Sequence, residues 1–229
     1  MGFGLISLGW LFIFDIPWKI DLMVDFLGCY LIMMGCRRLK PYSGYFAVAY
    51  KWFGVLVLPS VAITALEIAY TFLKKESLEQ YLLHLEVVHT LVFSVALYYL
   101  LMAMIRISTD VGRDKIARKC RRNIAVSMVT VLFYVATRLL VNVSFQNATL
   151  TGIIRISWLV GNVIWYLTLM LHFVQIFSCY MWICYEGDED MPIKESAIKT
   201  NPYARYEKKK ADRAAAEEQA APKKKKKKK

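Results

Sequence analysis

Long apolar runs alternate with short polar segments along this chain, and this pattern predicts an all-α protein in a membrane. Four runs, at about 45–73, 81–105, 124–143 and 153–185, are each long enough for a transmembrane helix, which needs about 20 residues. The composition agrees, since 57% of the 229 residues are apolar, more than a soluble chain of this length needs. We therefore predict a polytopic transmembrane helix bundle over 40–185.

Residues 1–39 form a predicted N-terminal hairpin of two apolar arms around a polar turn that contains Asp15, Lys19 and Asp21. Each arm is shorter than the roughly 20 residues that cross the hydrocarbon core. The bundle has five membrane segments if the hairpin counts as one unit and six if both arms cross. Asp25 follows Asp21 by one helical turn, and carboxylates at membrane depth usually face a bundle interior or a cavity.

Basic residues concentrate on one side of the predicted membrane. Four Lys and Arg lie between 37 and 51, and seven lie in the polar connection 106–122. The connections on the other side hold four, which are Lys19, Lys74, Lys75 and Arg155. Because cytoplasmic loops are enriched in Lys and Arg, we expect both basic segments and both chain ends on the cytoplasmic side (N-in, C-in).

The segment 186–229 is predicted to be a polar cytoplasmic tail. Of the 30 Lys and Arg in the chain, 14 follow Glu186. The chain closes on seven lysines, which we expect to contact anionic lipid headgroups: Lys223, Lys224, Lys225, Lys226, Lys227, Lys228 and Lys229. Nucleic acid is a disfavoured partner for this tail, because the membrane surface lies beside it.

Helical spacing places the polar residues of each apolar run on one stripe, which in lipid turns towards the bundle interior. The predicted topology then puts most of them in the outer half, above an inner half of mostly apolar residues. We expect a polar outer cavity or network that contains Asp21, Asp25, Glu67, Glu86, His89, Arg138, Arg155 and Asn162. The alternative is that these charges only pair to hold the bundle together, with Arg138 opposite Glu67 or Glu86.

Motifs for metal binding and catalysis are incomplete. Glu86 and His89 have the Glu-x-x-His spacing of di-metal bundles, but such sites need a second copy of this motif. We therefore predict neither a metal nor a cofactor. The sequence contains no Gly-x-Ser-x-Gly or His-Glu-x-x-His motif. The remaining enzymatic alternative is an intramembrane enzyme that uses the carboxylate pair Asp21 and Asp25.

The hairpin resembles that of uncharacterised small multi-pass membrane proteins of Gram-positive bacteria, which carry an Ile-Asp-x-x-Pro-Asp-Phe-x-Gly-Tyr pattern. The resemblance covers about the first 40 residues and departs at Val24, where proline is usual, and at Cys29, which separates the glycine from the tyrosine. It implies a bacterial cytoplasmic membrane, with the two aspartates as a signature. The matching residues are Ile20, Asp21, Asp25, Phe26, Gly28 and Tyr30, followed by Gly35 and Arg37.

The function predicted from these patterns is that of a non-enzymatic, multi-pass protein of the cell membrane. Its outer cavity would bind a small ligand or a membrane-protein partner, as a sensor, accessory subunit or scaffold. A small secondary transporter or proton-coupled permease is the first alternative, because short or broken helices are typical of transporter sites. Against it, the sequence shows neither an inverted repeat nor polar residues for a second gate in the inner half.

Overall fold

The computed structural model describes residues 2–13, 25–74, 76–141, 148–183, 199 and 201–220. Within these ranges the chain is an all-α bundle with an appended helix, and it contains no strand. The helices are α1 (Gly2–Ile13), α2 (Asp25–Leu39), α3 (Gly44–Leu73), α4 (Glu76–Asp110), α5 (Asp114–Leu140), α6 (Ala148–Ile183) and α8 (Pro202–Ala220).

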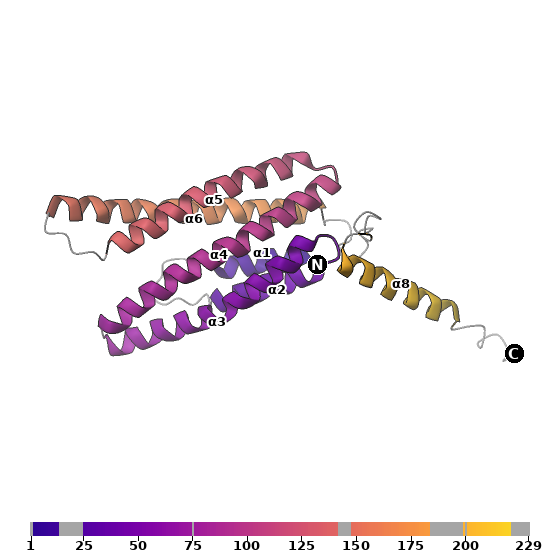
Figure 1. Cartoon of the computed structure of the whole chain (residues 1–229), viewed down its shortest axis with the longest axis horizontal. Helices are drawn as coiled ribbons and strands as arrows, with labels where there is room; N and C mark the ends of the chain where they lie inside the picture. The colour runs from indigo at the N-terminus through magenta and orange to yellow at the C-terminus, as the bar shows by residue number, and fades with distance from the viewer. Residues whose placement is uncertain are drawn as a thin grey trace.

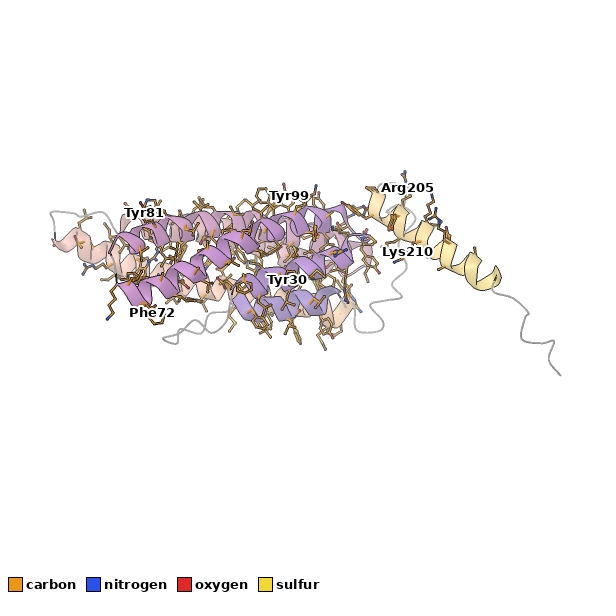
Figure 2. The ribbon with its side chains drawn as sticks, turned by 90° about the horizontal axis from the view of Figure 1, so that it is seen from below. Tyr30, Phe72, Tyr81, Tyr99, Arg205 and Lys210 are labelled. Carbon is orange, nitrogen blue, oxygen red and sulfur yellow. The ribbon has the colours of Figure 1, made fainter. Side chains whose placement is uncertain are left out.

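Four of these helices, α3 to α6, are long and apolar enough to cross a membrane. Their outward faces expose large apolar side chains, such as Phe72 at 82% and Leu58 at 77%, and Figure 2 shows Phe72 on the outside of the bundle. Water would oppose such a surface, whereas lipid tails accept it. The chain is therefore a membrane protein, with four candidate spans among its described residues.

The hairpin arms α1 and α2 reach only part of the way along the bundle (Figure 1). At a rise of 1.5 Å per residue, their 12 and 15 residues extend about 18 and about 22 Å, against about 30 Å of hydrocarbon core. The predicted polar turn, with Asp15, Lys19 and Asp21, lies outside the described residues.

Glycines bring the two hairpin arms into backbone contact. A Cβ atom built on Gly9 would lie 2.6 Å from the carbonyl oxygen of Gly28, and one on Gly28 would lie 2.7 Å from that of Gly9. One on Gly35 would lie 2.6 Å from the carbonyl oxygen of Gly2. No real Cβ atom sits so close to a carbonyl oxygen, so these positions require glycine. This is the close approach that small residues permit between helices in lipid.

Consecutive helices pack side by side from α1 to α6, and α1 closes the ring against α6. Large side chains from several helices fill the centre, among them Trp10, Phe53, Phe93 and Leu97, each at most 3% exposed. The indole nitrogen of Trp10 donates to the carbonyl of Leu169 at 3.1 Å, which ties α1 to α6. The hairpin is thus an integral part of the bundle.

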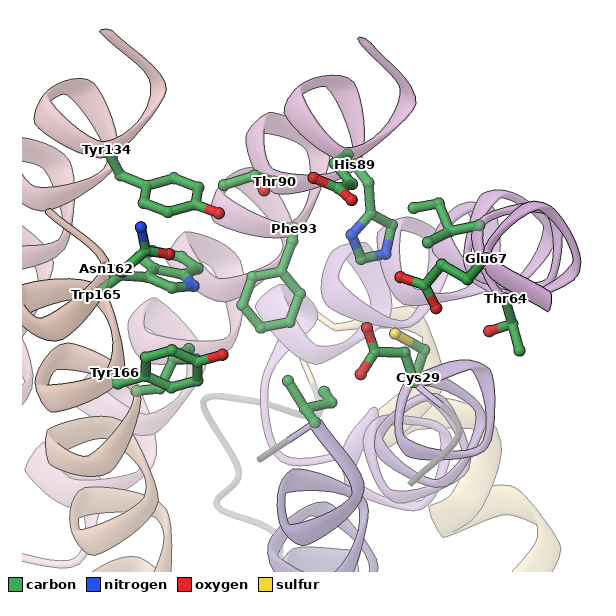
Figure 3. A pocket seen from close by; sticks show the side chains of 15 residues that line it. Cys29, Thr64, Glu67, His89, Thr90, Phe93, Tyr134, Asn162, Trp165 and Tyr166 are labelled. Carbon is green, nitrogen blue, oxygen red and sulfur yellow. The ribbon is translucent and has the colours of Figure 1, made fainter. Parts of the chain in front are cut away.

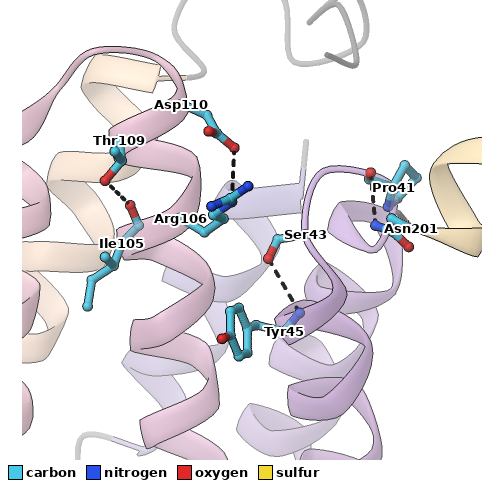
Figure 4. Close-up of polar contacts among 8 residues, drawn as sticks. All are labelled: Pro41, Ser43, Tyr45, Ile105, Arg106, Thr109, Asp110 and Asn201. Carbon is cyan, nitrogen blue, oxygen red and sulfur yellow. Dashed lines mark hydrogen bonds and ion pairs between the residues drawn. The ribbon is translucent and has the colours of Figure 1, made fainter. Parts of the chain in front are cut away.

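One end of the bundle, here called the basic end, holds the α2–α3 and α4–α5 turns (Figures 1 and 4). The segment 106–122, which the sequence predicted as a polar connection, is helical on both sides of a turn at 111–113. This correction has a local cause, because Lys and Arg are good helix formers and continue α4 and α5 past their apolar stretches. Gly112 makes the turn with φ +73°, a backbone conformation that suits glycine.

The tail helix α8 begins against the basic end and extends away from the bundle (Figures 1 and 2). The Asn201 side chain donates to the carbonyls of Lys40 and Pro41 at 2.8 and 3.2 Å, and its oxygen caps α8 by accepting from the Tyr203 amide at 3.1 Å. The Lys40 amine lies 3.4 Å from the ring centroid of Tyr50. Lys223 to Lys229 lie outside the described residues, so their predicted lipid contact stays a prediction.

Candidate functional site

A cavity of about 240 Å³ opens where the hairpin arms stop, in the half of the bundle away from the basic end. Ile13, the last residue of α1, and Asp25, the first of α2, line it together with residues of α3, α4, α5 and α6. The helices α1 and α2 end at this level, and among the described residues the four longer helices supply most of the rest of the lining. The remaining lining residues are Cys29, Ile63, Thr64, Glu67, Glu86, His89, Thr90, Phe93, Tyr134, Asn162, Trp165, Tyr166 and Leu169.

One wall of the cavity combines α2, α3 and α4. Figure 3 shows Glu67 and His89 on this side. The Ser60 hydroxyl donates to the Leu56 carbonyl at 2.8 Å and lies 2.9 Å from His89 Nε2. Because that hydroxyl has a single proton, the serine oxygen accepts from Nε2–H of the imidazole. The Ser60 bond and stacking on Phe93, with ring centroids 6.4 Å apart, fix the orientation of His89.

An ion pair joins α4 and α5 beside the cavity. A guanidinium nitrogen of Arg138 lies 2.6 Å from Oε2 of Glu86, and the two side chains are 24% and 26% exposed. The guanidinium also lies 5.7 Å from the ring centroid of Trp158. The prediction that Arg138 meets an acid on another helix is confirmed, and Glu86 is that acid.

The opposite wall is aromatic. Tyr134 stacks on Trp165 with ring centroids 5.4 Å apart, and Trp165 meets the Phe93 ring edge-on at 6.4 Å. Tyr166 lies on the same side, and Phe93 stands between the two walls (Figure 3). The cavity therefore has carboxylates on one side and aromatic side chains on the other.

Below the cavity, Trp10 forms a layer with Phe93, their ring centroids 5.8 Å apart. The side chain of His172 packs against the other side of Trp10, at 6.1 Å. Its Nε2 lies 2.6 Å from the hydroxyl of Ser127, and the imidazole is completely buried.

This imidazole and its neighbours correct the expectation that the half of the bundle towards the basic end offers no polar groups for a second gate. Asn123 and Gln175, 2% and 3% exposed, occupy the next turns of α5 and α6 towards the basic end. Among the described residues, no hydrogen-bond partner is found for Oδ1 of Asn123, Nε2 of Gln175 or Nδ1 of His172. The half of the bundle towards the basic end thus contains a polar layer. Hydropathy averaged over a span hides such isolated polar residues.

The structure brings together most of the residues that the sequence singled out. Asp25, Glu67, Glu86, His89 and Asn162 line the cavity, and Arg138 reaches its edge through Glu86. Arg155 is exposed on α6 and does not line the cavity, and Asp21 lies outside the described residues.

The aromatic lining residues Phe93 and Trp165 were missed, because nothing distinguishes them from neighbouring apolar residues. Tyr134 and Tyr166 had a signal, since both fall on the polar stripes of their helices. Metal chemistry finds no support in the lining. Within the described ranges, no group of three or more His, Cys, Asp and Glu side chains is arranged to hold a metal ion.

Comparisons with protein-family models, with curated proteins and with solved structures gave no match.

Proposed function

We propose that this chain is a non-enzymatic membrane protein that binds a small ligand in the cavity at the end of its hairpin. The observation that carries the proposal is the convergence of polar side chains from five helices, α2 to α6, on one space of about 240 Å³. Intramembrane polar groups are costly and usually mark a functional site. Pockets with a few convergent polar groups are the usual form of such sites.

In the orientation expected from the distribution of Lys and Arg, this cavity faces the outside of the cell. The basic turns lie at the opposite end of the bundle, and Lys and Arg favour the cytoplasmic side. A cavity open to the outside suits a sensor or an accessory subunit of the cell membrane.

Ligand binding is expected to raise the thermal stability of the purified protein in detergent. A ligand at 100 times its Kd adds about 2.7 kcal/mol to the free energy of unfolding. A panel of ammonium compounds, neutral polyols and carboxylates, added one at a time, should contain at least one stabilising class. Thr90→Leu, which fills part of the cavity from α4, should reduce that shift.

Thr109→Leu is the matched control, because Thr109 is an exposed residue of the same helix at the basic end. Equal responses of wild type and Thr90→Leu to every compound would contradict the proposed site.

A transporter is the second candidate, and the buried polar layer favours it. Ser127, His172 and Gln175 continue the polar interior past Trp10 towards the basic end. A transporter opens its site to each side of the membrane in turn, so polar groups on both sides of a central barrier favour this function. The Trp10–Phe93 layer would be that barrier.

Proton-coupled transport is expected to show as ligand-dependent proton movement in proteoliposomes loaded with a pH-sensitive dye. His172→Leu should abolish this movement while leaving ligand binding at the cavity intact. Binding without any ligand-dependent proton movement in the wild type would contradict proton-coupled transport and leave the binding proposal standing.

A further inference from the structure

The charged side chains in the described part of the lining are all acidic. Three of its described side chains are carboxylates, Asp25, Glu67 and Glu86, and none is Lys or Arg. Arg138 pairs with Glu86 from outside the lining. A recess with low-dielectric walls and charges of one sign concentrates ions of the opposite sign, so this lining attracts cations and opposes anions.

The aromatic wall has the same preference by an independent mechanism. Phe93, Tyr134, Trp165 and Tyr166 line the space, and the rings of Tyr134 and Trp165 are stacked with centroids 5.4 Å apart. The face of an aromatic ring attracts a cation, and aromatic cages bind substituted ammonium groups. Figure 3 shows Tyr134, Trp165 and Tyr166 across the cavity from Glu67. An ammonium group between them would have aromatic side chains on one side and a carboxylate on the other.

The size of the cavity and the arrangement of its ligating groups favour an organic cation over a metal ion as the ligand. The acidic and imidazole groups of the described lining are not arranged around one metal position. The volume of about 240 Å³ equals roughly eight water molecules at about 30 Å³ each, which corresponds to a molecule of about eight non-hydrogen atoms.

We propose that the cavity selects a small organic cation of the substituted or quaternary ammonium class, held between the carboxylates of α2, α3 and α4 and the rings of α4, α5 and α6. This inference rests on the proposed function and adds the chemical class of the ligand. The same headgroup chemistry occurs in free amines and in choline lipids, so the test separates the two sources.

The test measures radiolabelled choline binding to the full chain in dodecyl maltoside, with unlabelled competitors at constant ionic strength. Tetraethylammonium should compete, whereas 3,3-dimethyl-1-butanol, the neutral isostere of choline, should compete at least about tenfold more weakly. Acetate should not compete at all. The proposal would be overturned if the neutral isostere displaced radiolabelled choline as well as tetraethylammonium does. It would also be overturned if neither choline nor tetraethylammonium bound.

Two variants test the two walls. Glu67→Gln keeps the shape of the side chain, and Trp165→Leu keeps an apolar side chain without the ring. Each should weaken choline binding by at least about tenfold, in line with the loss of one ion pair or one cation–π contact. The matched control is Glu207→Gln, since Glu207 lies on α8 away from the cavity. Unchanged binding in both cavity variants would also overturn the proposal.

The lipid arm repeats the assay in nanodiscs. If phosphatidylcholine nanodiscs block choline binding and phosphatidylglycerol nanodiscs do not, the choline headgroup of the lipid is the natural occupant. If choline binds equally in both kinds of nanodisc, the natural occupant is a free cation. The proposed function fails separately, when no compound class distinguishes wild type from Thr90→Leu. If neutral polyols or carboxylates stabilise the wild type more than Thr90→Leu and choline does not, the proposed ligand class is wrong and the proposed binding site is retained.

Discussion

Gly9→Ala and Gly28→Ala are each expected to lower the free energy of unfolding by about 1–3 kcal/mol, the usual cost of overpacking a close contact. The added methyl group would lie 2.6 or 2.7 Å from a carbonyl oxygen of the other arm. Backbone cannot rotate away as a side chain can, so α1 and α2 must separate. The measurement is thermal or denaturant unfolding of the purified protein in detergent.

Gly152→Ala is the matched control, because a Cβ at Gly152 in α6 meets no atom within 4 Å. This change should be neutral or should stabilise α6 by up to about 1 kcal/mol, since alanine is the better helix former. Equal effects at Gly9 and Gly152 would show that the arms do not pack through backbone contact. Because Ile13 and Asp25 border the cavity, separation of the arms should also weaken ligand binding.

Arg138→Leu is expected to destabilise the bundle by about 2 kcal/mol. The change leaves the Glu86 carboxylate without the guanidinium that lies 2.6 Å away. The estimate is below the 3–5 kcal/mol typical of fully buried pairs, because both side chains are about a quarter exposed. Glu86→Leu in addition should restore part of the loss, since no unpaired charge then remains. A double-mutant cycle by thermal unfolding in detergent measures this coupling.

The pair Arg106 and Asp110 supplies the control cycle. These side chains are 62% and 31% exposed at the basic end, at a distance of 3.5 Å. Exposed pairs of this kind couple by about 0.3–0.5 kcal/mol. A coupling for Arg138 and Glu86 no larger than that of the control pair would show that the buried position adds nothing to their interaction.

The membrane class and the polar cavity could be predicted from the sequence, because both depend on local properties. Hydropathy over one helical length identifies a span without knowledge of its neighbours. A polar stripe on such a span must turn away from lipid, so Glu67, Glu86 and His89 were predicted to face inward together. Arg155 was predicted to belong to the same interior network but is exposed. Near a helix end a long basic side chain reaches water, so its position on a stripe does not bring it into the interior.

The sequence alone determined that the chain is an all-α membrane protein and that Glu67, Glu86 and His89 face the bundle interior, because exposure of charged or unpaired polar groups to lipid is costly. Tertiary structure decided that Glu86, rather than Glu67, pairs with Arg138, because several acids shared the permitted faces. It also decided that Phe93 and Trp165 line the cavity and that His172 meets Ser127 below Trp10. These contacts depend on the register between helices that are far apart in the chain. Packing sets that register, so it cannot be predicted from a local sequence pattern.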